Sequence, residues 1–263
     1  MIQYYKNGFH PLRSIHAELP GDHWAIDLAG PFPTSNHANH YLLVMVDIAT
    51  RFVILQAIPD KQAVTIAQHL FQVFCDFGFP KILQSDNGTE FVNKIVKALV
   101  DMASINHRLV TPYHPRANGV AECYVQTTVQ AIRKQIHGTK KDWDLYVPAV
   151  QFATNVKVAA IHGSTPFSLM FVRQYNLFQD YNQSLTKPLS YPTLKKCVDY
   201  LTTIVFPSIS AHTKGTQTKM VNRFNNKMFI QDIPFPDGSY VMTIDITRRG
   251  KLDPIYEGPF EVA

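Results

Sequence analysis

The order of short β-rich runs and helical segments restricts the fold of this chain more than any other sequence feature. Runs rich in β-branched and aromatic residues cover 23–28, 41–48 and 52–55, and the turn at Thr50-Arg51 indicates adjacent antiparallel strands. Further along, helices are predicted over 61–77 and 91–102, and strands over 81–85 and 105–110. Three strands followed by helix, strand, helix and strand predict an α/β layered architecture.

Beyond residue 110 the pattern is mostly helical. Residues 111–118 hold two prolines and are typical of an irregular loop, after which a helix is predicted from Gly119 to about His137. Residues 176–190 are polar and rich in turn formers, which predicts a domain edge. The remaining predictions are helices near 143–158 and 165–172, a basic helical region over 191–230, and a strand over 240–244.

Composition places the chain among folded proteins with a basic character. Hydrophobic residues make up 46% of the 263 residues, enough for a sizeable core, and charged residues are only 17%, which excludes a disordered polyelectrolyte. The formal net charge of +5 and the sequence pI of about 9.0 mildly favour a polyanionic partner. An ordinary basic globular protein is the simpler alternative.

Several classes of protein are excluded by what the sequence lacks. Cys75, Cys123 and Cys197 lie far apart and form no CxxC pair, which is typical of free thiols and excludes a cysteine-rich zinc module within these residues. No apolar run approaches the roughly 20 residues that span a membrane, so no membrane partner is expected. The N-terminus has no apolar segment after its basic residue and is not expected to be a signal peptide.

Three carboxylates stand out by their contexts: Asp27 within an apolar run, Asp86 after a predicted strand, and Glu122 in the first turn of a predicted helix. An ionised carboxylate inside an apolar strand is costly unless it is paired or binds a metal. Asp27 could also face water from an edge strand, which is its structural alternative. Asp47 lies in the next β-rich run and competes with Asp27, because spacing alone does not separate them.

Asp86 and Glu122 also have structural alternatives. Asp86 begins Asp-Asn-Gly, which is typical of a turn, but ligands of α/β sheets gather at the carboxyl ends of strands. Asn118 is the expected N-cap of the helix that contains Glu122. The helix dipole favours an ionised acid in that first turn, with or without a cation.

Together, the three acids predict a site for Mg²⁺ or Mn²⁺. Hard divalent cations prefer carboxylate oxygens as ligands. Two such ions held about 4 Å apart can activate an attacking oxygen and stabilise a leaving oxygen on the same phosphorus. The chain is therefore expected to cut or join nucleic-acid strands.

Three segments around these acids resemble the integrases of retroviruses and LTR retrotransposons, most closely the gypsy-type group. They are Trp24-Ala25-Ile26-Asp27-Leu28-Ala29-Gly30-Pro31, Ser85-Asp86-Asn87-Gly88-Thr89-Glu90-Phe91, and Thr111-Pro112-Tyr113-His114-Pro115 with Asn118-Gly119 and Glu122. The resemblance extends from about residue 19 to 173. It resumes over 251–260, which is similar to the Gly-Pro-Phe segment of the C-terminal module in that group.

The resemblance implies a ribonuclease H-like fold, a mixed five-stranded sheet flanked by helices, followed by a helical linker and a truncated small β-barrel. The implied segments are 1–18 as a linker remnant after a missing zinc module, 19–175 as the catalytic core, 176–235 as the linker and 236–263 as an incomplete β module. Asp27, Asp86 and Glu122 match the metal-binding and catalytic triad of the family. The position of Asp47 is not part of that triad.

The resemblance also implies an activity and partners. The family processes the 3′ ends of element DNA and joins them to target DNA, in two in-line displacements without a covalent enzyme intermediate. DNA is the expected partner, with RNA as a further option, and the expected state is a homo-oligomer in the nucleus. Side chains expected to contact DNA are Tyr113, His114, Arg116, Asn118, Arg133 and Lys134.

Departures from the family pattern keep other functions open. Cys123 follows Glu122 where an arginine is common, and loss of a guanidinium there would weaken phosphate contact. The N-terminal zinc module is expected to be cut off, and the chain to end at Ala263 before a β-barrel closes. The alternatives are a non-catalytic nucleic-acid-binding remnant and, more remotely, a ribonuclease that acts on RNA–DNA hybrids.

Overall fold

The computed structural model describes residues 17–110, 119–136, 139–175, 191–227, 238, 240–244 and 256–261. Two compact units divide the chain: Ser14–Gln217 forms one, and Met1–Arg13 with Thr218–Ala263 forms the other. The first unit contains β1 (His23–Ala29), β2 (Tyr41–Asp47), β3 (Val53–Ile58), α1 (Ala63–Phe77), β4 (Ile82–Ser85), α2 (Lys94–Met102), β5 (Asn106–Leu109), α3 (Gly119–Gln135), η1 (Lys140–Tyr146), α4 (Val147–Val156), α5 (Pro166–Phe171), α6 (Tyr191–Tyr200), η2 (Leu201–Val205) and the start of α7 (Phe206–Lys227).

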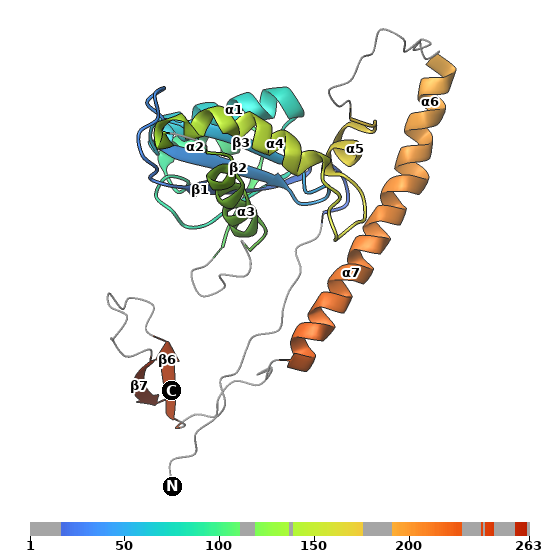
Figure 1. The fold of residues 1–263 in the computed structure, drawn as a ribbon. Helices are drawn as coiled ribbons and strands as arrows, with labels where there is room; N and C mark the ends of the chain where they lie inside the picture. Colours follow the sequence, from blue (N-terminus) through green and yellow to red (C-terminus); the bar gives the residue numbers. More distant parts are fainter. Residues whose placement is uncertain are drawn as a thin grey trace. The chain divides into compact units, whose positions relative to one another are not determined.

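A mixed five-stranded sheet forms the centre of the first unit (Figure 1). Its strand order is β3-β2-β1-β4-β5. Strand β1 pairs antiparallel with β2 and parallel with β4, and β4 pairs parallel with β5. The mixed five-stranded sheet flanked by helices that the resemblance implies is therefore confirmed, as is the antiparallel pairing of the first three strands.

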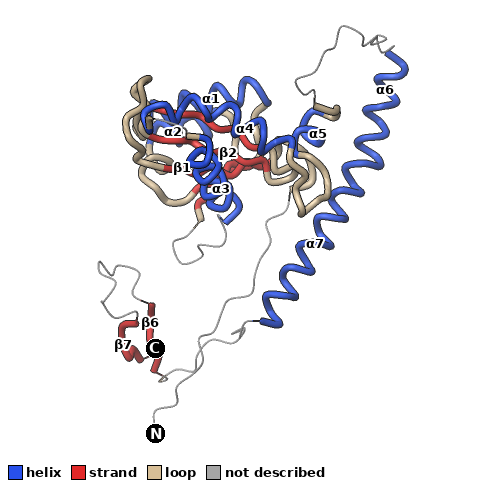
Figure 2. Tube along the Cα trace, in the orientation of Figure 1, coloured by secondary structure: helices blue, strands red, loops and turns tan. Residues whose placement is uncertain are grey.

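Helices α1 and α2 cover one face of the sheet, and α3 and α4 cover the other. Figure 2 shows the strands of the sheet among these helices. Side chains alternate along a strand, so Trp24 and Ile26 of β1 point to one face and Ala25 points to the other. On the first face, Trp24 and Ile26 pack with apolar residues of α1 and α2. On the second face, apolar residues of β2 and β3 pack with α3 and α4. All three β1 side chains are fully buried.

One predicted helix was wrong in its extent. The segment 143–158 is a 3₁₀ turn, η1 (Lys140–Tyr146), followed by α4 (Val147–Val156). Pro148 explains the break, because proline lacks the N–H that a helix interior requires but fits the first turn, where it lies here.

The second unit contains two strands, β6 (Tyr240–Ile244) and β7 (Tyr256–Glu261), which pair antiparallel. Strand β7 was not predicted from the sequence. The truncated β-barrel stays a prediction.

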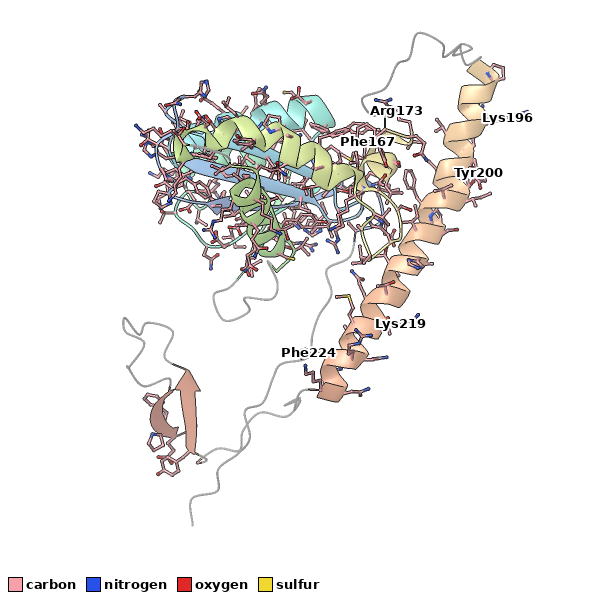
Figure 3. All side chains as sticks on the ribbon, in the orientation of Figure 1. Phe167, Arg173, Lys196, Tyr200, Lys219 and Phe224 are labelled. Atoms are coloured by element: carbon pink, nitrogen blue, oxygen red, sulfur yellow. The ribbon has the colours of Figure 1, made fainter. Side chains whose placement is uncertain are left out.

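The C-terminal part of the first unit is a succession of helices. Arg173, just after α5, lies 5.3 Å from the centre of the Phe167 ring, a cation–π contact (Figure 3). Helices α6 and α7 are joined directly by the π-helical stretch η2. Phe206 and Ile209 of α7 line a small cavity of about 20 Å³ together with Leu169 of α5. Within the residues that the structure describes, no helix has the length and apolarity needed to cross a membrane.

The free edge of strand β3 is capped by amide side chains from α4. The Asn155 Oδ1 atom accepts a 2.8 Å hydrogen bond from Val53 N–H, and Asn155 Nδ2 donates to the Val53 carbonyl at 2.8 Å. One turn earlier, Gln151 Oε1 accepts from Leu55 N–H at 2.6 Å. An edge strand has unpaired backbone groups, and buried groups of this kind must find partners. Helix α4 therefore replaces a sixth strand at this edge.

We expect Asn155→Ala to lower the free energy of unfolding by about 1–3 kcal/mol, because it leaves both backbone groups of Val53 buried without a partner. Urea unfolding followed by circular dichroism measures this change. Gln68→Ala removes an amide from an exposed position on α1 and serves as the control, with an expected effect within about 0.5 kcal/mol. Equal stability of the two variants would contradict the capping role.

Candidate active site

Parallel pairing of β1 with β4 brings Asp27 level with Asp86. The register aligns Ala25 with Gln84, so two residues further along both strands the two aspartates come opposite each other at the carboxyl ends. Asp27 and Ala25 point to the same face of the sheet because they are two residues apart. Both aspartates are half-buried. The sheet therefore places two carboxylates side by side where ligands of α/β folds bind.

Helix α3 brings Glu122 to the same face. Ala121 and Ala25 are both fully buried and pack in one cluster with Ile48. Alanine side chains on both the helix and the strand let the two backbones approach closely. Glu122 follows Ala121 directly, lies in the first turn of α3 and is exposed. The predicted triad thus comes from one strand, the turn after a second strand, and the start of a helix.

The carboxylates lie near enough to affect each other's ionisation. Burial is the main cause that raises the pKa of Asp27 to about 6, and repulsion from Asp86, Glu122 and Glu90 adds to it. A hydrogen bond of 2.8 Å from Leu28 N–H to Asp27 Oδ1 opposes this rise. Burial and the charge of Asp86 likewise raise the pKa of Glu122. The mutual repulsion shows that the three predicted acids share one region of the molecule.

A chain of hydrogen bonds from His107 through Ser85 fixes the backbone carbonyl of Asp86. Ser85 Oγ donates to the Asp86 carbonyl oxygen at 2.9 Å. The single Ser85 hydroxyl hydrogen is used there, so the 2.9 Å contact between Ser85 Oγ and His107 Nε2 requires His107 to donate. Burial lowers the pKa of His107, which keeps it neutral. The Asp86 carboxylate accepts a separate hydrogen bond, from Gly88 N–H to Asp86 Oδ1 at 3.0 Å.

Nothing described in the structure neutralises the site's charge. None of the ion pairs among the described residues involves Asp27, Asp86 or Glu122. No three acids, histidines or cysteines among them lie close enough together, as the side chains stand, to ligate one metal ion. Grouped anionic oxygens that lack a cation fit a hard divalent ion chemically.

Asp47, the rival of Asp27, has a structural role. It pairs with Trp24 across the sheet and points to the opposite face from Asp27. Its Oδ1 accepts from Gly21 N–H at 3.0 Å, and its Oδ2 accepts from the backbone N–H and hydroxyl of Thr50 at 2.8 and 2.6 Å. Burial raises the pKa of Asp47 to about 6 against these hydrogen bonds. Asp47 therefore fixes the β2–β3 turn and stays outside the candidate site.

Most of the predicted DNA contacts cannot be placed. Tyr113, His114, Arg116 and Asn118 lie outside the described residues. Arg133 and Lys134 lie in the last turn of α3 and are exposed. Their contact with DNA stays a prediction.

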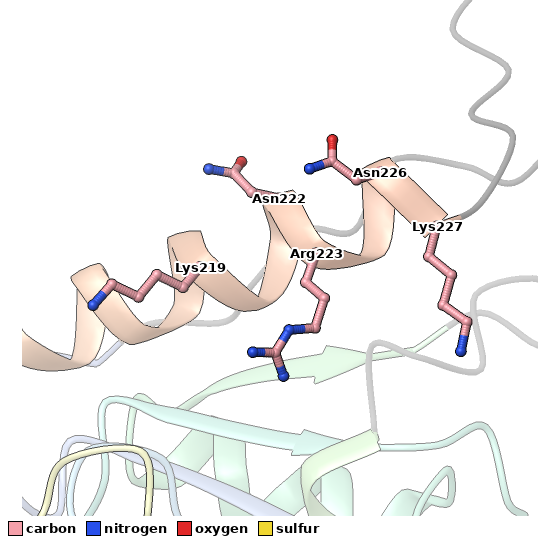
Figure 4. Close-up of a pocket in the computed structure, with 5 residues that line it drawn as sticks. All are labelled: Lys219, Asn222, Arg223, Asn226 and Lys227. Carbon is pink, nitrogen blue, oxygen red and sulfur yellow. The ribbon is translucent and has the colours of Figure 1, made fainter.

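The end of α7 lies in the basic helical region predicted over 191–230 and presents a basic face. Lys219, Asn222, Arg223, Asn226 and Lys227 line one open hollow along this helix (Figure 4). Their spacing of three and four residues places them on neighbouring helical positions. All five are exposed, so three cationic groups and two amides face solvent together. We call this set the α7 basic strip.

Sequence reasoning also missed three residues around Asp86. Ser85 and His107 were assigned only to strands, and Glu90 was treated only as part of a motif. The sequence offered only weak signals for a role of these residues at the site: Ser85 directly precedes Asp86, and Glu90 follows Asp86 four residues later. The β4–β5 register pairs Ser85 with Leu109, and this places His107, two residues earlier on β5, near Ser85. No local sequence pattern indicates this register.

Comparisons with known proteins agree with this architecture. Residues 17–115 match the integrase core domain family. The chain is 27% identical over 246 residues to the retrovirus-related Pol polyprotein from transposon 412 of Drosophila melanogaster, covering 92% of this chain and 20% of that protein. It is 29% identical over 159 residues to gypsy retrotransposon integrase-like protein 1 of Bos taurus, covering 60% of this chain and 32% of the relative.

Structural similarity supports the same fold. A chain in the cryo-EM structure of the simian T-cell lymphotropic virus intasome in complex with PP2A regulatory subunit B56 gamma superimposes with a TM-score of 0.55 at 15% identity, covering 71% of this chain and 67% of that one. This chain spans a third or less of the length of the two curated relatives. The matched segment, the mixed sheet and the relatives together show that residues 17–115 are similar to the integrase core domain, and that the chain is similar to a retrotransposon Pol polyprotein and to a gypsy retrotransposon integrase-like protein.

Proposed function

We propose that this chain is the catalytic part of a divalent-metal-dependent integrase, which processes the 3′ ends of element DNA and joins them to target DNA. The observation that supports it most is the convergence of Asp27, Asp86 and Glu122 on one face of the sheet, without a cationic partner among the described residues. Three anionic groups in one region repel each other unless a cation lies between them.

Asp27, Asp86 and Glu122 are the residues that would hold Mg²⁺ or Mn²⁺, most simply as two ions. When bound, the cations supply electrostatic stabilisation of the attacking and leaving oxygens. The raised pKa of Asp27 lies near 6, so this carboxyl group is mostly ionised at neutral pH and can act as a ligand. The hydrogen bonds from Leu28 and Gly88 N–H orient the two aspartates before any ion arrives.

The proposed chemistry has two displacements at phosphorus. In the first, a water oxygen forms a bond to phosphorus near the DNA end, and the bond to the leaving 3′ oxygen breaks. In the second, the freed 3′-hydroxyl oxygen forms a bond to a target phosphorus and displaces another 3′ oxygen. The carboxylates position these groups and form no covalent intermediate. Nucleic acid integration of this kind suits a nuclear protein that assembles into oligomers on DNA, which we also propose.

A non-catalytic DNA-binding remnant is the second candidate function. The specific observation in its favour is that the acids, as described, do not form a group of three around one ion position. Cys123 beside Glu122 also replaces a basic group expected there. DNA binding without metal-dependent cleavage would support this alternative.

We expect the purified chain to nick duplex DNA, or to reverse strand joining on a branched substrate, only with Mg²⁺ or Mn²⁺. Asp27→Asn, Asp86→Asn and Glu122→Gln should each lower this activity to the level seen without metal, because a ligand charge is lost. Gel analysis of labelled DNA measures it. Asp76→Asn, which removes an exposed acid of α1, is the matched control and should keep full activity. Activity in Asp86→Asn equal to that of the control would refute the assignment.

We expect Ser85→Ala to weaken Mn²⁺ binding by roughly tenfold, since groups that orient metal ligands typically contribute this much. The variant removes the donor to the Asp86 carbonyl and the acceptor of His107. Calorimetric titration of the chain with Mn²⁺ measures the change. Thr202→Ala, at an exposed hydroxyl in η2, is the control. An unchanged dissociation constant in Ser85→Ala would show that the hydrogen-bond chain does not position Asp86.

We also expect DNA affinity to fall steeply between roughly 50 and 200 mM salt, as it does when cationic side chains contact phosphates. Replacing Lys219, Arg223 and Lys227 of the α7 basic strip together by alanine should reduce the slope of log K against log salt by roughly 0.9 for each lost phosphate contact. Fluorescence anisotropy with a labelled duplex gives both slopes. Replacing the exposed Lys94, Lys97 and Lys157 by alanine controls for net charge. Identical slopes in the two triple variants would exclude the strip as a DNA contact.

A further inference from the structure

A fourth carboxylate lies against the turn that contains Asp86. A Cβ atom added to Gly88 would lie 2.8 Å from Glu90 Cδ and 3.0 Å from Glu90 Oε2. The same position is 3.0 Å from Asp86 Oδ1. The carboxylates of Asp86 and Glu90 therefore approach the same side of Gly88, and only a residue without a side chain leaves room for both.

The backbone of this turn directs Glu90 toward the site. The Gly88 carbonyl accepts hydrogen bonds from Phe91 N–H and Val92 N–H, both at 2.9 Å. The Phe91 side chain is 1% exposed and packs into the core between the sheet and helices α1 and α2. Asn93 Nδ2 donates to the Glu90 carbonyl at 2.8 Å. With its neighbour fixed in the core and its own carbonyl bound, Glu90 is held on the side of Asp86.

The position of Glu90 close to Asp86 is energetically unfavourable unless a cation lies nearby. Glu90 is half-buried, and its charge contributes to the repulsion that acts on Asp27. No lysine, arginine or histidine in the described part of the chain forms an ion pair with it. Like charges in a partly desolvated region raise the free energy of the folded state, and a divalent cation between them reverses the sign of that contribution.

We propose that Glu90 is a fourth acidic group of the cation site, next to Asp27, Asp86 and Glu122. Because Mg²⁺ usually keeps several of its waters, Glu90 acts on the hydrated ion by accepting hydrogen bonds from its water shell and by adding negative charge. The proposal rests on the proposed function, since it assumes that the three matched acids bind a divalent cation.

The test uses the whole chain without DNA and Mn²⁺ alone as the probe, with calorimetry and thermal unfolding as readouts. Glu90→Gln should raise the Mn²⁺ dissociation constant by roughly tenfold. Without metal, the same variant should melt at an equal or higher temperature than the unchanged chain, because one repulsive charge is gone. A residue with a merely structural role would lower the melting temperature and leave metal affinity alone. Glu90→Asp keeps the charge and should bind Mn²⁺ more tightly than Glu90→Gln.

The outcomes separate this inference from the proposed function. Asp76→Asn should bind Mn²⁺ like the unchanged chain, and Asp86→Asn should show no measurable binding. If Glu90→Gln binds Mn²⁺ as tightly as Asp76→Asn while Asp86→Asn does not bind, the role of Glu90 is overturned and the proposed function stands. If the unchanged chain does not bind Mn²⁺ at all, the metal-dependent function itself fails and the role of Glu90 fails with it.

Discussion

The parallel pairing of β1 with β4 is the constraint on which the candidate site depends. It brings Asp27 level with Asp86 at the ends of two central strands. A shift by one residue would send the Asp27 side chain to the opposite face, where Trp24 and Ile26 fill the core. The close packing of Ala25 with Ala121 then determines how near the first turn of α3 can come. Larger side chains at either position would move Glu122 away from both aspartates.

The charges of the site show a balance between folding and function. Burial is the main cause that raises the pKa of Asp27, and repulsion from the neighbouring acids adds to it, so the ionised carboxylate lowers the stability of the metal-free protein. The structure limits the cost with backbone hydrogen bonds to the carboxylates of Asp27 and Asp86. Acidic groups kept together in this way are expected where a ligand of opposite charge completes the arrangement.

Much of the fold could be predicted because local patterns determine it. The β-rich run around Asp27 and the helical spacing in α1 are features of neighbouring residues, and the structure has both elements close to the predicted ranges. The division of 143–158 by Pro148 was missed although proline is a local signal, because the apolar spacing continues across it. Tertiary contacts could not be predicted from local patterns. Nothing in the sequence near Ser85 indicates that His107 donates a hydrogen bond to it.

The candidate site was predictable to a similar degree. Motif resemblance predicted a site of Asp27, Asp86 and Glu122. The structure brings these acids into one region, and their role stays a prediction. The position of Glu90 depends on the path of a turn whose hydrogen bonds begin at the Gly88 carbonyl. A turn that reverses within a few residues changes direction with small differences in backbone angles, so its side-chain contacts do not follow from spacing.

The amide caps on β3 have a consequence for how this sheet can associate with other chains. Asn155 and Gln151 occupy the outward-facing backbone groups of β3, so a foreign strand cannot extend the sheet there without displacing α4. At the other border, β5 is largely exposed. An exposed edge strand can pair with a strand of another chain, so strand addition to this sheet is directed to β5, the neighbour of the strand that ends just before Asp86.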